Sequence, residues 1–269
     1  MAAVYRWELR KLRAQKRTYL GLVGAMLVPI AFVVALAAQN GAGPSDVPLG
    51  RGLRETGLAV PFVVLFFMSI WGLPLVTALV AGDIVASESH NGTLKTILTR
   101  SRERGQVFAG KTCAAATYTL VALFAMVALG VAAGVIEFGW HPLTSLSGTK
   151  VVPLTGLGLL ALSSLVYAWP LLAIAAFGIL LSTVTRNSAA SVVGTLMFAL
   201  LMQLLGALPG TEPIRPYLLG EQFSAWHGLL RRPTDWAPIE RAAWVCALYA
   251  AVSLCAGYLV FLRRDVTGD

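Results

Sequence analysis

The sequence predicts an all-α polytopic membrane protein with six transmembrane helices. Of the 269 residues, 57% are hydrophobic and 13% are charged, and that charged fraction is about half of what soluble domains carry. Apolar stretches of about 20 residues are long enough to cross roughly 30 Å of hydrocarbon as helices. The connections between them are too short to form a soluble domain, so the whole chain, 1–269, is expected to be one transmembrane domain. The expected spans are 19–38, 58–82, 112–136, 153–183, 189–208 and 240–262.

Residues 1–18 precede the first span and predict a helix that lies on the membrane surface. At helical spacing, one narrow arc holds four arginines, and the opposite side is apolar. The arginines are Arg6, Arg10, Arg13 and Arg17, and the apolar residues are Val4, Tyr5, Leu9 and Leu12. The alternative is a disordered tail whose charges only set the topology.

The distribution of basic residues predicts the orientation. With six spans both termini share one side, and seven of the 21 lysines and arginines fall on the other side. Those seven are Arg51, Arg54, Lys150, Arg215, Arg231, Arg232 and Arg241. Because cytoplasmic loops carry the excess of Lys and Arg, we expect a multi-pass protein of the cell (inner or cytoplasmic) membrane with both termini in the cytoplasm. The net charge of +8 then favours anionic membrane lipids as partners and not nucleic acid, since the basic residues lie beside spans.

Ionisable residues are placed in a way that argues against several functions. Asp83 and Glu137 fall at span ends, and no ionisable residue lies deep within a predicted span, which disfavours an ion-coupled carrier. His90, His141 and His227 fall in loops, so intramembrane proteolysis lacks its catalytic groups. No metal site is indicated, and an enzyme function has no residues to carry it.

The stretch GQVFAGKT, residues 105–112, matches the G-x-x-x-x-G-K-T pattern of a phosphate-binding P-loop. A P-loop follows a buried apolar strand, but the preceding residues are TRSRER. The four residues inside the pattern include no further glycine to shape an amide-lined nest. We therefore expect no nucleotide site on this chain.

The loop over residues 84–111 follows the second span and is the most informative stretch. Asn91-Gly92 is a helix stop signal, and Thr93 can cap a new short helix. In that helix Leu94, Ile97 and Leu98 form one apolar face. A face on so short a helix needs a surface to dock on, which is a partner protein, the lipid surface or the chain's own bundle.

The run ASESHNGTLKTILTRSRERGQVFAGK, residues 86–111, resembles the cytoplasmic loop of ABC-2 type permeases, the membrane subunits of ATP-binding-cassette exporters. The features shared with that family are an acidic residue, a G-T-L step, a short leucine-rich helix, a basic turn and a closing Gly-Lys. They fall on Glu88, Gly92, Thr93, Leu94, Ile97, Leu98, Arg104, Gly110 and Lys111. The sequence departs from the pattern at Ser101, where proline is common, and at Glu103, where serine is common.

This resemblance implies a transport subunit with no catalytic site and no cofactor of its own. In the family, two permease subunits, identical or related, pair with two ABC ATPase subunits that bind ATP and Mg. The loop after the second span is the coupling element, so Leu94, Ile97 and Leu98 would dock in the ATPase, with Glu88, Arg104 and Lys111 as nearby charge partners. The weakly charged spans favour export of an amphiphilic substrate: a peptide, a lipid or a hydrophobic drug.

Two alternatives remain at this stage. The chain could be a non-transporting membrane scaffold or an immunity-type protein that sequesters a toxic peptide, and an ion-coupled carrier is the weaker possibility. The outer segment 209–238 also allows two interpretations. Its aromatic residues predict either a belt at the membrane interface or, by resemblance to the family, short helices that dip back into the outer leaflet. These residues are Tyr217, Phe223, Trp226 and Trp236.

Overall fold

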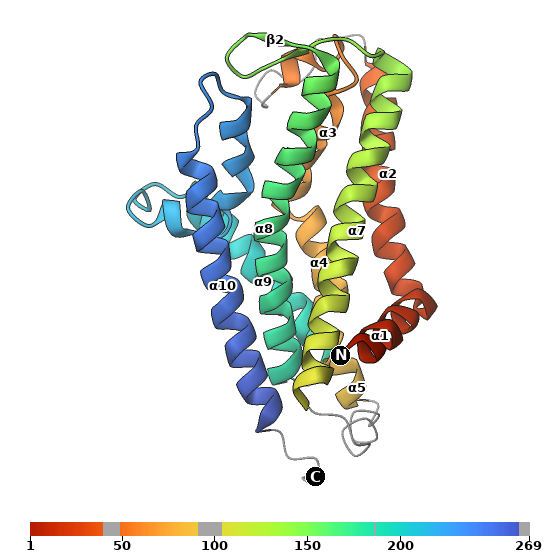
Figure 1. Ribbon diagram of the computed structural model, residues 1–269, viewed down its shortest axis with the longest axis vertical. Coiled ribbons are helices and arrows are strands. Elements are labelled where there is room, and N and C mark those ends of the chain that lie inside the picture. The colour runs from red at the N-terminus through yellow and green to blue at the C-terminus, as the bar shows by residue number, and fades with distance from the viewer. Residues whose placement is uncertain (40–48, 91–103, 186, 264–269) are drawn as a thin grey trace.

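The described part of the chain is a bundle of long helices, which confirms the all-α prediction (Figure 1). The computed structural model describes residues 1–39, 49–90, 104–185 and 187–263. The α-helices are α1 (Ala2–Ala14), α2 (Lys16–Ala38), α3 (Ala59–Ile70), α4 (Gly72–Ala81), α5 (Ala86–His90), α7 (Arg104–Phe138), α8 (Pro153–Thr185), α9 (Ser188–Ala207) and α10 (Ala237–Leu262). Short 3-10 helices are η1 (Gly50–Gly52), η2 (Arg215–Tyr217) and η3 (Glu221–Leu230), and β1 (Leu143–Thr144) pairs antiparallel with β2 (Lys150–Val151).

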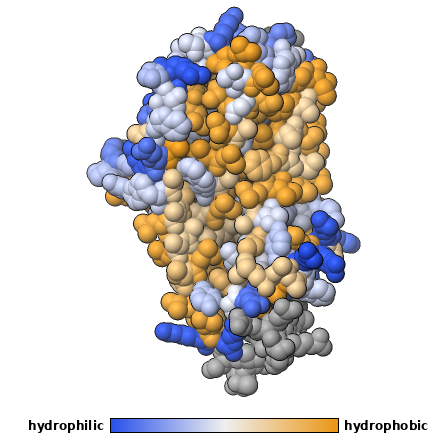
Figure 2. All heavy atoms as spheres, in the orientation of Figure 1, coloured by the Kyte–Doolittle hydropathy of each residue, from blue (hydrophilic) through white to orange (hydrophobic). Residues whose placement is uncertain are grey.

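The long helices match the expected spans closely and make this a multi-pass membrane protein. Within the described residues, five helices are long and apolar enough to cross a membrane: α2, α7, α8, α9 and α10. A sixth crossing is present if the bent pair α3 and α4 counts as one span. Figure 2 shows apolar residues over the middle of the molecule and polar residues toward its two ends and on a projecting segment.

The ends of the bundle differ in what they hold. The chain's N-terminus, α1, α5 and the last turns of α10 lie together at one end, which we call the terminal end (Figure 1). The β1–β2 hairpin lies at the other end, the distal end (Figure 1). Between them α8 is the most buried of the long helices, and it packs against α4, α7, α9, α10 and η3.

The expected span 58–82 is not one straight helix, because it breaks at Trp71 and bends by 60°. Pro74 explains the position of the break: its ring removes a donor and clashes with the carbonyl of the residue four positions earlier, Ile70. A helix break frees backbone carbonyls that need new partners inside a membrane. The side-chain amide of Gln203, on α9, donates to the carbonyl of Ser69 at 3.0 Å.

The expected surface helix 1–18 is shorter in the structure, since α1 ends at Ala14 and Gln15 is extended with φ −95° and ψ 124°. Arg6, Arg10 and Arg13 are exposed on α1, as their arc predicts. The placement of Arg17 on that helix is wrong, because Arg17 lies on α2 and its guanidinium pairs with Asp83.

The apolar face of α1 packs against α7. Leu12 is buried and Leu9 is half-buried. The contact is close because Gly110 of α7 has no side chain; a Cβ there would lie 2.7 Å from a methyl group of Val4.

At the distal end two glycines bring backbone against backbone. A Cβ added to Gly57, just before α3, would lie 2.2 Å from the carbonyl carbon of Gly134 in α7. The amide of Gly57 also donates to the carbonyl of Gly139 at 3.1 Å. Residues larger than glycine would force these two segments apart.

The four aromatic residues of the segment 209–238 do not all have the same environment. Tyr217 and Trp236 are exposed, as residues of an interface belt would be, but Phe223 and Trp226 are buried in the core. Trp226 stacks on Phe62 with ring centroids 5.5 Å apart. The short helices η2 and η3 are present, and η3 packs on α8 and α10.

Candidate functional site: a buried charge cluster at the terminal end

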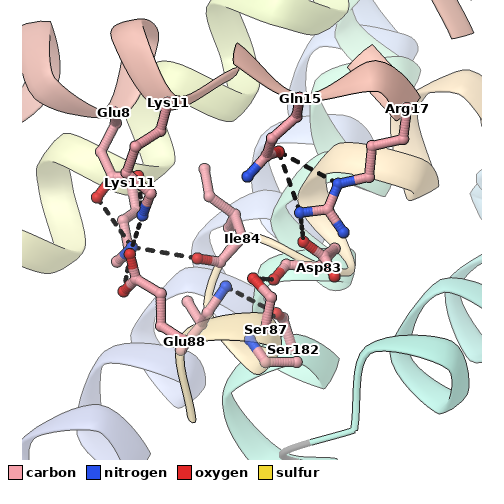
Figure 3. A network of polar contacts seen from close by, with 12 residues as sticks. Glu8, Lys11, Gln15, Arg17, Asp83, Ile84, Ser87, Glu88, Lys111 and Ser182 are labelled. Carbon is pink, nitrogen blue, oxygen red and sulfur yellow. Dashed lines mark hydrogen bonds and ion pairs between the residues drawn. The ribbon is translucent and has the colours of Figure 1, made fainter. Parts of the chain in front are cut away.

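Four charged side chains from three helices meet inside the terminal end of the bundle (Figure 3). Glu8 and Lys11 come from α1, Glu88 from α5 and Lys111 from α7. We call these four residues the charge cluster. They are remote in the sequence, so the fold assembles them.

Lys111 is the centre of the charge cluster. Its ammonium nitrogen lies 2.9 Å from Oε1 of Glu8 and 2.6 Å from Oε2 of Glu88. It also donates to the backbone carbonyl of Ile84 at 3.1 Å. The side chain is 0% exposed, and its three donors therefore meet three acceptors, as a buried ammonium requires.

Lys11 closes the charge cluster on its more exposed side. Its ammonium pairs with Glu88 and lies 3.3 Å from Oε2 of Glu8. Burial opposes the charged form of Lys11, but the carboxylates of Glu88 and Glu8 outweigh it and raise the pKa of Lys11 above its ordinary value. Two cations thus balance two carboxylates.

A second ion pair lies beside the charge cluster. Arg17 of α2 pairs with Asp83, which is 2% exposed and lies just after α4, and the hydroxyl of Ser188 in α9 donates to the same carboxylate. A buried carboxylate needs such partners, and here they come from α2 and α9.

The start of α5 is fixed to α8. The hydroxyl oxygen of Ser182 accepts hydrogen bonds from the amides of Val85 and Ala86 at 3.1 and 2.9 Å. With Glu88 held by α1 and α7, the segment that leads into residues 91–103 is therefore anchored from three directions.

The charge cluster is suited to link helices in a small number of arrangements. Separating two buried opposite charges leaves each unpaired in a low-dielectric site, and removing one partner of such a pair typically costs about 3–5 kcal/mol. Continuous sliding of α5 against α1 and α7 is therefore opposed. A concerted shift that keeps the ion pairs, or a switch to a second paired state, is permitted.

Residues 105–112, which match the P-loop pattern, lie within the continuous helix α7. No strand precedes them in the described residues, and the Lys111 ammonium that would bind phosphate is occupied by two carboxylates and a carbonyl. The helical backbone gives no nest of amides. In this structure residues 105–112 therefore do not form a P-loop.

The structure places three of the predicted coupling residues. Glu88 and Lys111 are paired with each other, and their side chains are 5% and 0% exposed. Arg104 donates to the carbonyl of Leu262 at 2.6 Å and so joins the start of α7 to the end of α10. The other predicted coupling residues lie outside the described residues: Gly92, Thr93, Leu94, Ile97 and Leu98.

Sequence reasoning missed two residues of the charge cluster, Lys11 and Glu8, and of the two Glu8 carried a signal in the sequence. It lies on the same face of α1 as Tyr5 and Leu12, three positions after one and four before the other. An acidic residue within an apolar helical face needs a buried cation. That signal was present in the sequence, but it does not identify the cation that pairs with Glu8.

A family model described as "Protein of unknown function (DUF2705)" matches residues 27–267. The chain belongs to the DUF2705 family. The search of curated proteins found no match to the chain.

In this DUF2705 chain the matched range begins inside α2 and includes Asp83, Glu88 and Lys111 but not Glu8 or Lys11. The family model therefore covers the α5 and α7 sides of the charge cluster. The α1 side lies before the matched range.

Proposed function

We propose that this chain is the permease subunit of an ATP-driven exporter of the ABC-2 type. It forms the membrane-spanning path with a second permease subunit, identical or related, and a separate ABC ATPase supplies ATP binding and hydrolysis. Its substrate is an amphiphile such as a peptide, a lipid or a hydrophobic drug. The terminal end of the bundle faces the cytoplasm of the cell membrane, in line with the excess of lysine and arginine there.

The observation that carries this proposal is the position of the charge cluster next to the loop that resembles the ABC-2 coupling element. Glu88 belongs to the resembling run 86–111 and lies on α5, which leads into residues 91–103. Its carboxylate contacts Lys11 of α1 and Lys111 of α7. Force applied to the loop by a partner would thus pass through ion pairs to two further helices.

In this proposal the predicted coupling residues divide into two groups. Leu94, Ile97 and Leu98 dock in the ATPase, because their apolar face needs a surface. Glu88 and Lys111 act within the chain, since both are buried against each other. ATP binding draws two ATPases together, the docked loops follow, and α5 carries α1 and α7 toward an outward-open arrangement.

A purification experiment tests the proposal. The tagged chain is isolated from the membranes of the organism that makes it, and vanadate-sensitive ATPase activity is measured in the eluate. The double variant Leu94→Ala with Ile97→Ala loses burial worth roughly 1.5–3 kcal/mol per side chain, so the co-purified ATPase activity should fall at least about tenfold. Lys95→Ala, on another side of the expected helix, is the matched control.

The outcomes separate transport from the alternatives. A scaffold or immunity-type protein would give no co-purified ATPase activity with the wild-type chain. Wild-type activity in the double variant would show that the apolar face docks elsewhere, on lipid or on the bundle.

A reporter fused at Lys95 tests the orientation on its own. It should report a cytoplasmic position, and an external position would contradict both the topology and the coupling.

A further inference from the structure

The distal half of α10 borders two cavities of opposite character. The first, of about 530 Å³, is apolar and lies between α8, α9, η2 and α10. Half of its ten lining residues are aromatic: Phe177, Phe198, Tyr217, Trp244 and Tyr249. The second, of about 300 Å³, is polar and lies between η3 and the first turns of α10, with Glu221, His227, Arg231 and Arg241 in its lining.

The apolar cavity is walled by rings that hold one another in place. Phe177 stacks on Phe198 with centroids 3.9 Å apart, and Tyr217 contacts Trp244 at 5.8 Å. Along α10 the cavity extends from Trp244 to Ser253, which at 1.5 Å per residue is about 13 Å. These walls belong to helices with the hydropathy of membrane spans, so the cavity is long, apolar and within reach of lipid chains.

The polar cavity carries an excess of positive charge. Arg231 and Arg241 outnumber Glu221 in its lining, although Arg231 also pairs with Asp235 at 3.5 Å. Among the described residues, the guanidinium of Arg241 has no ion pair. An anion with several oxygens would suit these donors.

His227 supplies a further unsatisfied group in the polar cavity. Its Nε2 atom is buried and has no hydrogen-bond partner among the described residues. Buried polar atoms rarely lack a partner. A ligand oxygen in the cavity would provide one.

The two cavities follow each other along one face of α10. Arg241 lines the polar cavity, and Val245, Leu248 and Val252 line the apolar one. Spacings of three and four residues place these positions in one stripe. Since α10 has 26 residues, it is about 39 Å long and exceeds the roughly 30 Å of hydrocarbon, which leaves length for its first turns, beside the polar cavity, to extend into the headgroup layer.

We propose that a phospholipid with an anionic headgroup binds along the distal half of α10, with its phosphate in the polar cavity and one acyl chain in the apolar cavity. The polar cavity selects the headgroup through Arg241, Arg231 and His227. The apolar cavity holds the chain against aromatic walls. The lipid at this site comes from the surrounding bilayer. The lipid-site proposal therefore does not depend on the proposed transport function.

Native mass spectrometry of the full chain tests the site. The chain is purified in a mild detergent with equal amounts of phosphatidylglycerol and phosphatidylcholine, and the lipid that stays bound is identified. The wild-type chain should retain one phosphatidylglycerol in preference to phosphatidylcholine. Leu248→Trp, which fills the apolar cavity from an exposed position, should reduce retention of both lipids about tenfold.

Arg241→Gln tests the headgroup contact separately. It should lower the preference for phosphatidylglycerol about tenfold, the effect of one lost charge-assisted contact, while lipid retention through the apolar cavity persists. Matched controls are Arg232→Gln and Leu259→Trp, which change exposed residues outside both cavities. Both should behave as the wild-type chain does.

Three results would overturn the proposal. The first is unchanged retention in Leu248→Trp, and the second is an unchanged headgroup preference in Arg241→Gln. The third is loss of a dimer in Leu248→Trp without loss of lipid, which would assign the apolar cavity to a second copy of the chain. Thermal unfolding of each variant, measured in parallel, distinguishes a lost site from a misfolded chain.

Discussion

The ammonium nitrogen of Lys111 lies 2.6 Å from Oε2 of Glu88, and the two side chains are 0% and 5% exposed. A pair so shielded from water does not serve as a contact surface for another protein. It joins α5 to α7 inside the chain, and Glu8 and Lys11 extend the connection to α1.

Lys111→Met should destabilise the chain by about 3 kcal/mol, because Glu8 and Glu88 then share only Lys11. Adding Glu88→Gln restores the balance of charge, so the double variant should be more stable than Lys111→Met alone. The measurement is the thermal midpoint in detergent, converted to a coupling energy by a double-mutant cycle. Lys16→Met, at an exposed neighbouring position, is the control and should change little.

Additive effects of Lys111→Met and Glu88→Gln would contradict this account. Additive effects would mean that Lys111 and Glu88 contribute to stability independently of each other, although they are in contact.

The purified chain should not bind ATP through residues 105–112, because these residues form part of α7 and Lys111 is already paired. Equilibrium dialysis with labelled ATP and Mg should give the same negligible binding for the wild-type chain and for Lys111→Met. Saturable micromolar binding that Lys111→Met abolished would show that α7 unwinds to form a phosphate site.

Gln203→Met should weaken the junction between α3 and α4, because it keeps the length of the side chain but removes the donor to the Ser69 carbonyl. A buried carbonyl left without a partner costs about 1–3 kcal/mol. The expected result is a lower thermal midpoint and faster hydrogen exchange around Trp71. The adjacent change Met202→Leu, apolar to apolar, should leave both close to wild type.

His227 should make the folded chain less stable in mild acid. Burial, with a contribution from Arg231, lowers the pKa of His227 to about 4, against about 6.5 in an unfolded chain. Between pH 6.5 and pH 4 the histidine binds a proton in the unfolded chain but not in the folded chain. The stability of the folded chain therefore falls as the pH drops below 6.5. From pH 6.5 to pH 5 the loss is at most about 2 kcal/mol.

The test for His227 compares thermal midpoints at pH 7.5 and pH 5 in neutral detergent without anionic lipid. The wild-type chain should lose more stability than His227→Gln over this interval. His141→Gln, at an exposed histidine, should follow the wild type. Equal acid sensitivity of the wild-type chain and His227→Gln would contradict the lowered pKa.

Hydropathy predicted the spans well because it depends on local composition alone. The expected span 189–208 corresponds to α9, which runs from Ser188 to Ala207, and 153–183 corresponds to α8. The expected span 58–82 was drawn as one segment that contains Pro74, and the structure divides it at Trp71. Proline is tolerated within spans when neighbouring groups satisfy the freed carbonyls, as in α2 around Pro29, so its presence does not predict a break.

The charge cluster could not be assembled from the sequence, because pairing between distant residues depends on how helices pack. Arg17 fits the arginine arc of a longer α1, and only the extended residue Gln15 moves it to α2 and toward Asp83. Glu88 and Lys111 were named from the resemblance, but as charges offered to a partner. Their burial depends on α1, whose close approach requires Gly110.

The contact between Gly57 and Gly134 has a mechanical consequence for the whole bundle. Two backbones in contact, with no side chain between them, cannot slide without first separating, and the amide of Gly57 resists separation through its bond to Gly139. The contact between Gly57 and Gly134 thus favours rotation of α7 against α3 about this contact over sliding. A small rotation of this kind displaces α7 most at its opposite end, near Lys111.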